Sequence, residues 1–240
     1  MTQLPPSSSS DFSHVETWVF DLDNTLYPAE CNLFAQIDLK MTQFVSRVLS
    51  VEAQEARRIQ KSYYADYGTT LNGLMTVHGL NPRDFLDFVH DIDLTPLDQA
   101  PELATAISAL PGRRYIFTNG SRKHAERVAS RMKIDHLFDD VFDIEASLFA
   151  PKPSRAAYER FIRQTGAVPS RSAMFEDISR NLEPAAHLGF TTVLVRSPMD
   201  WSGEPQGVRP AGPGEHPPHV HHATDNLDSF LRGLTLPKVR

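Results

Sequence analysis

Three short apolar runs in the sequence each end abruptly at polar residues that could do chemistry. The runs cover residues 18–20, 115–117 and 173–175. The polar residues that follow them are Asp21 and Asp23, then Thr118, Asn119 and Gly120, and finally Glu176 and Asp177. Short apolar runs bounded in this way are typical of buried strands. Because the carboxyl ends of parallel strands meet at one edge of a sheet, we expect these residues to converge there on a ligand.

The residue types at this edge suit the chemistry of phosphate and magnesium. Magnesium prefers oxygen ligands in octahedral geometry and keeps several waters, so two or three carboxylates could supply the protein ligands of a magnesium site. The hydroxyl of Thr118, with the backbone amides of Asn119 and Gly120 at a helix start, is suited to hold phosphate oxygens. Lys152, in a Pro-Lys-Pro-Ser segment, could add a point charge to a phosphoryl group.

Each motif also has an ordinary structural interpretation. Asp-x-Asp-x-Thr alone is compatible with a solvated turn and a helix N-cap, and Glu176 and Asp177 could cap the helix that follows them. Lys152 alone would be a solvated loop residue, since lysine is rarely buried without a partner. The occurrence of all these motifs in order along one chain favours a shared site.

The elements that position these motifs alternate between strand and helix patterns. Further strands are predicted over residues 141–144, 191–195 and 219–222, and helices over Arg122–Met132 and Ser154–Thr165. This alternation predicts an α/β fold with a mainly parallel sheet. Residues 1–13 are rich in Ser and Pro and are expected to form a flexible tail. Residues 197–218 are rich in Pro and Gly, so we expect an irregular loop there without chemistry.

Between the first strand and residue 96 the pattern is helical. Apolar residues from Phe34 to Val48 follow one helical face, and no strand signal interrupts them. Helices are predicted near 30–49, 51–67, 70–78 and 82–90, with Ser50 as the N-cap of the second and Asn81 before Pro82 at the start of the last. The insertion leaves and returns at the carboxyl end of the first strand, where it can act as a lid.

Composition limits the classes of function. The chain has 240 residues with 40% hydrophobic residues and a net charge of −6, which disfavours a nucleic-acid polymer as partner. The single Cys31 cannot form an intramolecular disulfide, the first residues lack the pattern of a signal peptide, and no apolar run approaches the roughly 20 residues of a membrane helix. We therefore expect a cytoplasmic protein without a membrane partner, either a monomer or a homodimer.

The ordered motifs resemble those of the haloacid dehalogenase-like hydrolase superfamily over residues 17–196. They are Asp21-Leu22-Asp23-Asn24-Thr25, Thr118-Asn119-Gly120, Lys152 and Glu176-Asp177. The resemblance implies a Rossmann-like parallel sheet of order 5-4-1-2-3 with helices on both faces. It also implies a core formed by residues 14–28 and 97–240, and a helical cap of the C1 type over residues 29–96.

The resemblance also implies roles for the motif residues. Asp21 would be the nucleophile that becomes an aspartyl phosphate, and Asp23 the general acid and base. One Asp21 oxygen, the Asp23 carbonyl and Asp177 would bind Mg²⁺ directly, with Glu176 acting through water. Many relatives have Asp where this chain has Glu176. Thr118, Asn119, Gly120 and Lys152 would hold the phosphoryl group.

A finer resemblance, to pyrimidine 5'-nucleotidases, is carried by Asp21-Leu22-Asp23-Asn24-Thr25-Leu26-Tyr27-Pro28 and by residues 67–74. It implies UMP or CMP as the substrate. Asn72 could then read a base edge and one of Tyr63, Tyr64 and Tyr67 could stack on the base, although aromatic residues at this spacing are more often core.

Several alternatives remain open. The chain could be a phosphatase of sugar phosphates or pyridoxal phosphate, a phosphomutase, or a catalytically silent interaction protein. A dehalogenase is disfavoured, because that branch lacks the counterpart of Asp23 and needs no metal. The histidines between 216 and 222 alternate along a predicted strand without accompanying carboxylates or cysteines, so we do not expect a metal there.

Overall fold

A central parallel sheet organises the computed structural model, which describes residues 10–201 and 209–236. Its six strands lie in the order β3-β2-β1-β4-β5-β6, and every neighbouring pair is parallel. The strands are β1 (Thr17–Phe20), β2 (Arg113–Phe117), β3 (Asp140–Phe142), β4 (Ser172–Glu176), β5 (Thr191–Val195) and β6 (His222–Thr224). Strands β1–β5 lie in the predicted order 5-4-1-2-3 when the sheet is read from the β6 edge, and β6 adds one more strand beside β5. The predicted fold class is confirmed.

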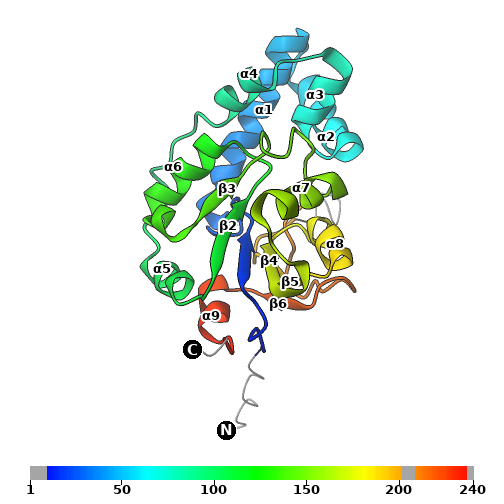
Figure 1. The fold of residues 1–240 in the computed structure, drawn as a ribbon. Helices are drawn as coiled ribbons and strands as arrows, with labels where there is room; N and C mark the ends of the chain where they lie inside the picture. The colour runs from blue at the N-terminus through cyan, green and yellow to red at the C-terminus, as the bar shows by residue number, and fades with distance from the viewer. Residues whose placement is uncertain (1–9, 202–208, 237–240) are drawn as a thin grey trace.

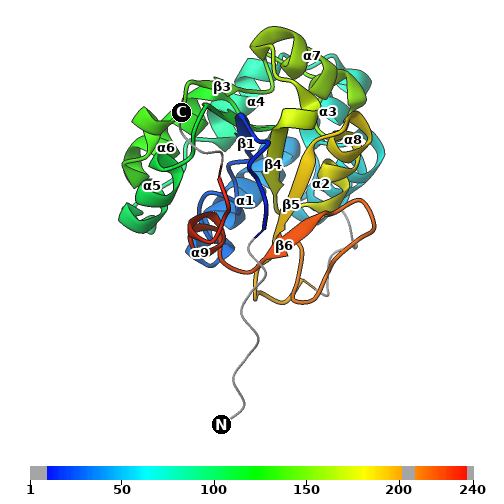
Figure 2. The same ribbon diagram turned by 60° about the horizontal axis from the view of Figure 1, so that its bottom comes forward.

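Helices cover both faces of the sheet because residues along each strand alternate between two apolar layers. Trp18 and Phe20 belong to one layer and Val19 to the other. The first layer includes side chains of α5 (Pro101–Ser108), α6 (Arg122–Met132) and α9 (Leu227–Arg232). The second includes side chains of α7 (Arg155–Thr165) and α8 (Ser179–Leu188). Figure 2 shows the two groups of helices on opposite sides of the strands.

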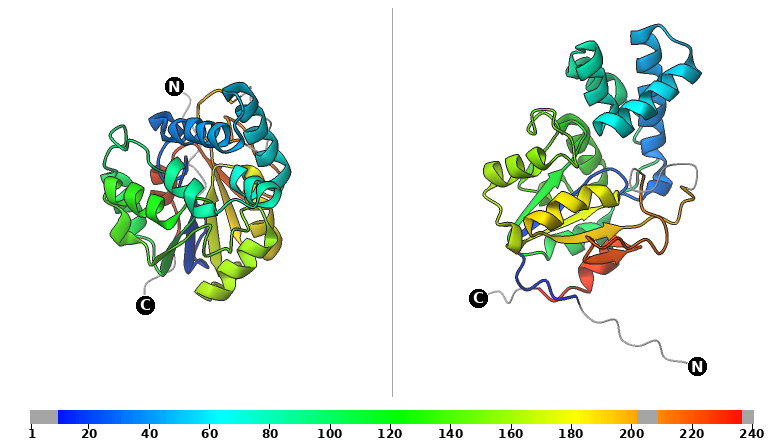
Figure 3. Two further views of the ribbon diagram at one scale, coloured as in Figure 1. Left: turned by 90° about the horizontal axis from the view of Figure 1, so that it is seen from above. Right: turned by 90° about the vertical axis from the view of Figure 1, so that its right-hand side faces the viewer.

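The chain between β1 and α5 forms helices that stand above the sheet (Figure 3). They are α1 (Leu33–Leu49), α2 (Ala53–Tyr67), α3 (Thr70–His78) and α4 (Pro82–Val89). Asn81 caps α4, and Pro82 occupies its first turn as predicted. The N-cap prediction for the second helix is wrong, because Ser50 adopts a left-handed conformation (φ 53°) that ends α1, and Glu52 precedes α2.

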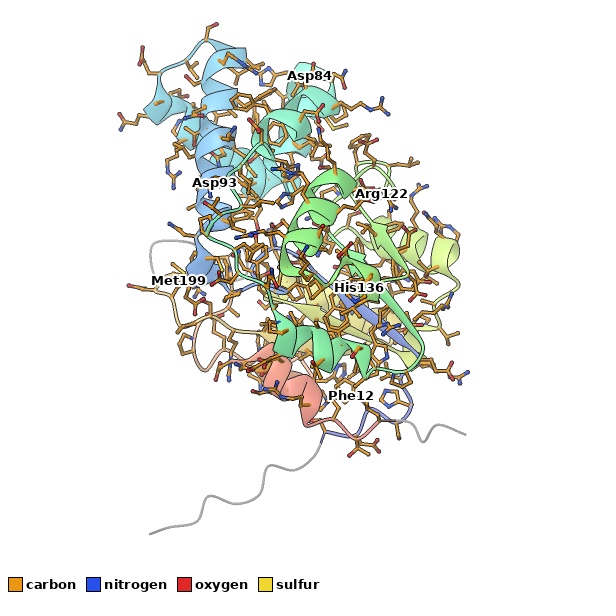
Figure 4. All side chains as sticks on the ribbon, turned by 90° about the vertical axis from the view of Figure 1, so that its left-hand side faces the viewer. Phe12, Asp84, Asp93, Arg122, His136 and Met199 are labelled. Carbon is orange, nitrogen blue, oxygen red and sulfur yellow. The ribbon has the colours of Figure 1, made fainter. Side chains whose placement is uncertain are left out.

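The expected flexible tail is wrong for its last residues. Phe12 is completely buried, its ring lies 6.0 Å from that of Trp18, and its amide donates to the Thr235 carbonyl. One aromatic side chain beside an apolar face therefore outweighs the polar composition around it. Residues 1–9 lie outside the described residues. Figure 4 shows Phe12 at the end of the molecule opposite Asp84 of α4.

The Pro- and Gly-rich segment after β5 lacks regular structure where it is described, as expected, but it packs on the core. The amide of Ala211 donates to the Asp177 carbonyl, and Arg209 pairs with Glu215 at 2.6 Å. Residues 202–208 of this predicted loop lie outside the described part of the chain. Among the helices that the structure describes, none has both the length and the apolar character to cross a bilayer.

Candidate active site

The central strand delivers Asp21 to the carboxyl edge of the sheet. β1 lies between β2 and β4, and the Asp21 amide continues the ladder by donating to the Phe175 carbonyl at 2.9 Å. This bond fixes the backbone one residue past the strand, and the Asp21 side chain is 9% exposed. The residue is thus held rigidly while its carboxylate faces the cavity above the sheet.

Lys152 is buried against the ends of three strands. Its ammonium donates to Asp21 Oδ1 at 2.6 Å, to Glu176 Oε2 at 2.7 Å and to the Phe117 carbonyl at 2.8 Å. The side chain is 1% exposed, so the two carboxylates supply the charge partners that a buried lysine needs. Burial opposes the charged form, but Asp21 and Glu176 prevail and raise the pKa of Lys152.

Asn119 positions the backbone of Lys152. Its side-chain carbonyl accepts from the Lys152 amide at 2.7 Å, and its amide group donates to the Lys152 carbonyl at 3.1 Å. The buried Thr118 hydroxyl accepts from the Gly120 amide at 2.9 Å. The Gly120 amide therefore already has a partner, contrary to the expectation that it is open to phosphate. Thr118, Asn119 and Lys152 do lie together, as predicted.

Three acidic side chains converge beside Lys152. Ligand oxygens of Asp21, Glu176 and Asp177 lie within 4.8 Å of one another, and all three residues are buried. Burial and the charge of Glu176 raise the pKa of Asp21 to about 8, although Lys152 opposes them. Burial and Glu176 also raise the pKa of Asp177 well above its ordinary value. So much buried negative charge favours a bound cation.

The donors fit a magnesium ion, and they differ in how free they are. Glu176 uses one oxygen for Lys152 and the other for the Ile178 amide. Asp177 Oδ2 is buried and has no hydrogen-bond partner among the described residues. Magnesium binds carboxylate oxygens, so Asp177 Oδ2 is the more available ligand, whereas both oxygens of Glu176 are already hydrogen-bonded.

The side chain of Asp23 has contacts with residues outside the acidic cluster. Its Oδ1 accepts from the Tyr27 hydroxyl at 2.6 Å and lies 3.0 Å from His124 Nε2. Burial raises the pKa of Asp23, but His124 and Tyr27 outweigh it and leave the pKa lowered. The His90 ring stacks on the His124 ring with centroids 4.4 Å apart. Sequence reasoning missed Tyr27, His90 and His124, because only the fold brings the two histidines to residue 23.

A cavity of about 360 Å³ connects these residues to α1–α4. Its wall includes apolar side chains of α1 and α4, the ring of Tyr64 from α2, and part of the segment after β5. The members from that segment are Met199, Trp201, Arg209 and Pro210. Sequence reasoning assigned this segment no chemistry, and its composition carries no signal for this placement. The Arg180 guanidinium lies 5.0 Å from the Tyr64 ring centre, and burial raises the pKa of Tyr64 to about 12.

The structure does not bring Asn72 to the other predicted site residues. Its side-chain amide donates to the Tyr67 carbonyl at 2.8 Å, where it helps to end α2. Asn72 and Tyr67 line a separate hollow beside Pro151. Tyr63 packs against Gly73 and bonds to His78. Of the three tyrosines considered from the sequence, Tyr64 is the one that lines the catalytic cavity.

The histidines near the carboxyl end serve structural contacts. His219 Nε2 bonds to the Ser179 carbonyl at 2.7 Å, and His221 Nδ1 contacts Thr192 Oγ1 at 2.7 Å. Within the described ranges, the group of side chains that could hold a metal is the one formed by Asp21, Glu176 and Asp177.

This site and sheet define a class of hydrolase. The sequence profile described as haloacid dehalogenase-like hydrolase matches residues 15–189, and the chain belongs to this family. Structural comparison gives a TM-score of 0.58 with a phosphatase of the family from Thermococcus onnurineus, at 17% identity and covering 92% of this chain and 99% of the other. It gives 0.54 with L-2-haloacid dehalogenase from Xanthobacter autotrophicus, at 16% identity and covering 91% and 97%. These likenesses establish the fold.

Two curated relatives share more sequence. Phosphate metabolism protein 8 of Saccharomyces cerevisiae is 26% identical over 209 residues, which are 79% of this chain and 64% of the yeast protein. Enolase-phosphatase E1 of Methylococcus capsulatus is 29% identical over 144 residues, which are 58% of this chain and 59% of that protein. The chain thus spans less than two thirds of the length of either relative.

Proposed function

We propose that this hydrolase is a magnesium-dependent phosphatase of small phosphate monoesters, with Asp21 as nucleophile. The observation that carries the proposal is the position of Asp21, which lies at a strand end and is bonded to buried Lys152. Beside it lies an oxygen of Asp177 to which no described residue hydrogen-bonds. A carboxylate can approach an anionic ester only where cations and fixed donors offset the shared negative charge. Lys152 and the acidic metal site would supply that compensation together.

The proposed reaction has two steps on Asp21. One Asp21 oxygen attacks phosphorus, the ester P–O bond breaks, and Asp23 gives a proton to the departing oxygen. Asp23 then takes a proton from the water that cleaves the aspartyl phosphate, which releases inorganic phosphate and returns Asp21 to its carboxylate and Asp23 to its protonated form. Thr118 would hold a phosphoryl oxygen, and Lys152, whose protons bond to Asp21, Glu176 and the Phe117 carbonyl, would act as a fixed positive charge beside the phosphoryl group.

The metal would be held by an Asp21 oxygen, the Asp23 carbonyl and Asp177, with Glu176 supporting Lys152 and reaching the metal through water. When bound, Mg²⁺ would neutralise phosphoryl charge and orient the ester for in-line attack. The open Asp177 Oδ2 and the doubly bonded Glu176 support this division of roles.

Residues 29–96 are proposed to act as a cap that selects the substrate, and residues 14–28 and 97–240 as the hydrolase core. We assign pyrimidine nucleoside 5'-monophosphates, UMP and CMP, as the substrates. An apolar wall and the Tyr64 ring in the 360 Å³ cavity support a leaving group that carries a flat aromatic base. Since Asn72 lies elsewhere, base selection is assigned to the residues of this cavity. The proposed setting is the cytoplasm.

Phosphate release tests this function. The purified protein is incubated with UMP, CMP, AMP, pyridoxal phosphate and sugar phosphates, with Mg²⁺ or with excess chelator. We expect hydrolysis that requires Mg²⁺ and favours UMP and CMP, loss of turnover in Asp21→Asn, and normal turnover in the matched surface variant Asp91→Asn.

The outcomes separate the parts of the proposal. Full activity in Asp21→Asn would exclude the nucleophile, and undiminished turnover in chelator would exclude the metal. Equal rates on purine and pyrimidine nucleotides would leave a broad phosphatase. Isomerised phosphate esters instead of free phosphate would indicate a phosphomutase, and inactivity on every ester would favour an interaction protein.

A further inference from the structure

The side chain of Asp23 is held by two residues to which neither the motifs nor the comparisons assign a role. The Tyr27 hydroxyl donates to Asp23 Oδ1 at 2.6 Å, and His124 Nε2 lies 3.0 Å from the same oxygen. Tyr27 is 1% exposed and His124 also 1%, whereas the Asp23 side chain is 16% exposed. Both partners are therefore fixed parts of the core, and the carboxylate they hold reaches the cavity.

Both contacts fall on one oxygen of the carboxylate. Two donors on Oδ1 fix the rotation of the carboxyl group, and Oδ2 receives neither of these bonds. A general acid transfers its proton efficiently only when the proton-bearing oxygen lies within hydrogen-bond reach of the leaving oxygen. With Oδ1 held twice and Asp23 lining the cavity, Oδ2 is the oxygen left to carry a proton for a departing ester oxygen.

The His124 ring is itself held from two directions. His90, which ends α4, stacks on it with an interplanar angle of 10° and also contacts the Ser121 hydroxyl through Nδ1 at 3.0 Å. The His124 amide in turn donates to the same Ser121 hydroxyl. The imidazole therefore sits between the start of α6 and the end of the helical insertion. Its position is set by groups that do not touch Asp23.

We infer that Tyr27 and His124 are positioning residues that orient Asp23 for proton transfer to the leaving group. The inference rests on the proposed phosphatase function and extends it to two residues that have no role in that proposal. The inference predicts how the rate depends on the leaving group. Removing either contact should slow the departure of poor leaving groups, which need a proton, far more than that of p-nitrophenolate, which leaves without one.

The experiment compares kcat/KM for a series of aryl and alkyl phosphates, from p-nitrophenyl phosphate to simple alkyl esters. This parameter includes steps only up to departure of the alcohol, so later hydrolysis of the aspartyl phosphate does not enter it. The variants are Tyr27→Phe, which deletes one hydroxyl, and His124→Leu, which keeps the volume without the donor. His124→Gln returns an amide donor near the position of Nε2. Asp23→Asn defines the effect of losing the acid, and Tyr115→Phe is a tyrosine control on β2.

We expect Tyr27→Phe and His124→Leu to lower kcat/KM about 10- to 100-fold for alkyl phosphates and less than about 3-fold for p-nitrophenyl phosphate. His124→Gln should recover most of the loss. KM should change little, because the phosphoryl group keeps its ligands. Thermal melts identify any variant that fails to fold, and Tyr27→Phe remains decisive if His124→Leu does.

Two results would overturn the inference. If Asp23→Asn steepens the dependence on leaving group but the Tyr27 and His124 variants lose all substrates equally, the two residues are only structural. If Asp23→Asn leaves the dependence unchanged, Asp23 is not the acid, and both this inference and that part of the proposed function fail. A wild-type protein that hydrolyses none of the esters would exclude the phosphatase function itself.

Discussion

Replacing Lys152 by Met is the sharpest test of the site as an electrostatic unit. The ammonium uses all three of its protons, on Asp21, Glu176 and the Phe117 carbonyl. Methionine fills a similar volume but leaves the buried side chains of Asp21 and Glu176 without their cation. Breaking a buried ion pair by removing one partner typically destabilises a protein by about 3–5 kcal/mol. We therefore expect the free energy of unfolding of the metal-free protein to fall by about this amount at neutral pH.

Urea unfolding followed by circular dichroism measures the change. The loss should shrink as the pH falls, because Asp21, whose pKa is raised to about 8, takes up a proton and no longer needs the lysine charge. The double variant Lys152→Met with Glu176→Gln should recover part of the stability for the same reason. Lys123→Met is the matched control, since Lys123 pairs with Asp87 on the surface, where such pairs contribute about 0–1 kcal/mol. A change below about 1 kcal/mol in Lys152→Met would refute the buried network.

Three further predictions concern the metal, the cap and the N-terminal segment. Because the pKa of Asp21 is raised to about 8, a proton competes with Mg²⁺ for this carboxylate below that pH. Calorimetry should therefore show that the affinity for Mg²⁺ increases from about pH 6 to about pH 8. The variant Asp177→Asn should abolish Mg²⁺ binding. Without metal, the free energy of unfolding should fall as the pH rises over the same range, because Asp21 in the folded protein holds a proton that the unfolded chain has released. A free energy of unfolding that does not change with pH would contradict this. Tyr64→Leu should raise KM for UMP about 5- to 150-fold, which corresponds to a stacking energy of about 1–3 kcal/mol, whereas Tyr63→Leu should not. Phe12→Ala should lower the free energy of unfolding by about 3–5 kcal/mol, because Phe12 is completely buried. The control Leu39→Ala, at an exposed position, should change it little. Equal effects of the two variants would argue against the buried position of Phe12.

The sheet and its motifs were predictable because their signals are local. Buried strands such as Thr191–Val195 contain short apolar runs, and the polar residue after each run marks the edge where parallel strands end. The strand predicted over 219–222 instead runs from His222 to Thr224, since a short edge strand with half-buried residues lacks that apolar run. Helix starts depended on caps, and Ser50 was misassigned because its left-handed conformation ends one helix before the next begins.

The rest of the site depends on contacts that no local pattern encodes. His124 reaches Asp23 across 101 positions in the chain, and its place depends on how α6 packs against the first loop. The direction of Asn72 depends on the rotation of α3 within the insertion, which residue types alone do not specify. Trp201 and Arg209 line the cavity from the described parts of the segment after β5, where bonds such as that of Ala211 to Asp177 hold the chain against the core.

The two tryptophans of the chain have different surroundings. Trp18 is completely buried between β1 and Phe12, with its Nε1 donating to the Pro111 carbonyl, whereas Trp201 lines the catalytic cavity. Intrinsic fluorescence therefore carries two separate signals. Emission from Trp18 should follow global unfolding, and emission from Trp201 should follow ligand entry. Paired single-tryptophan proteins would report binding and folding in one cuvette without any added label.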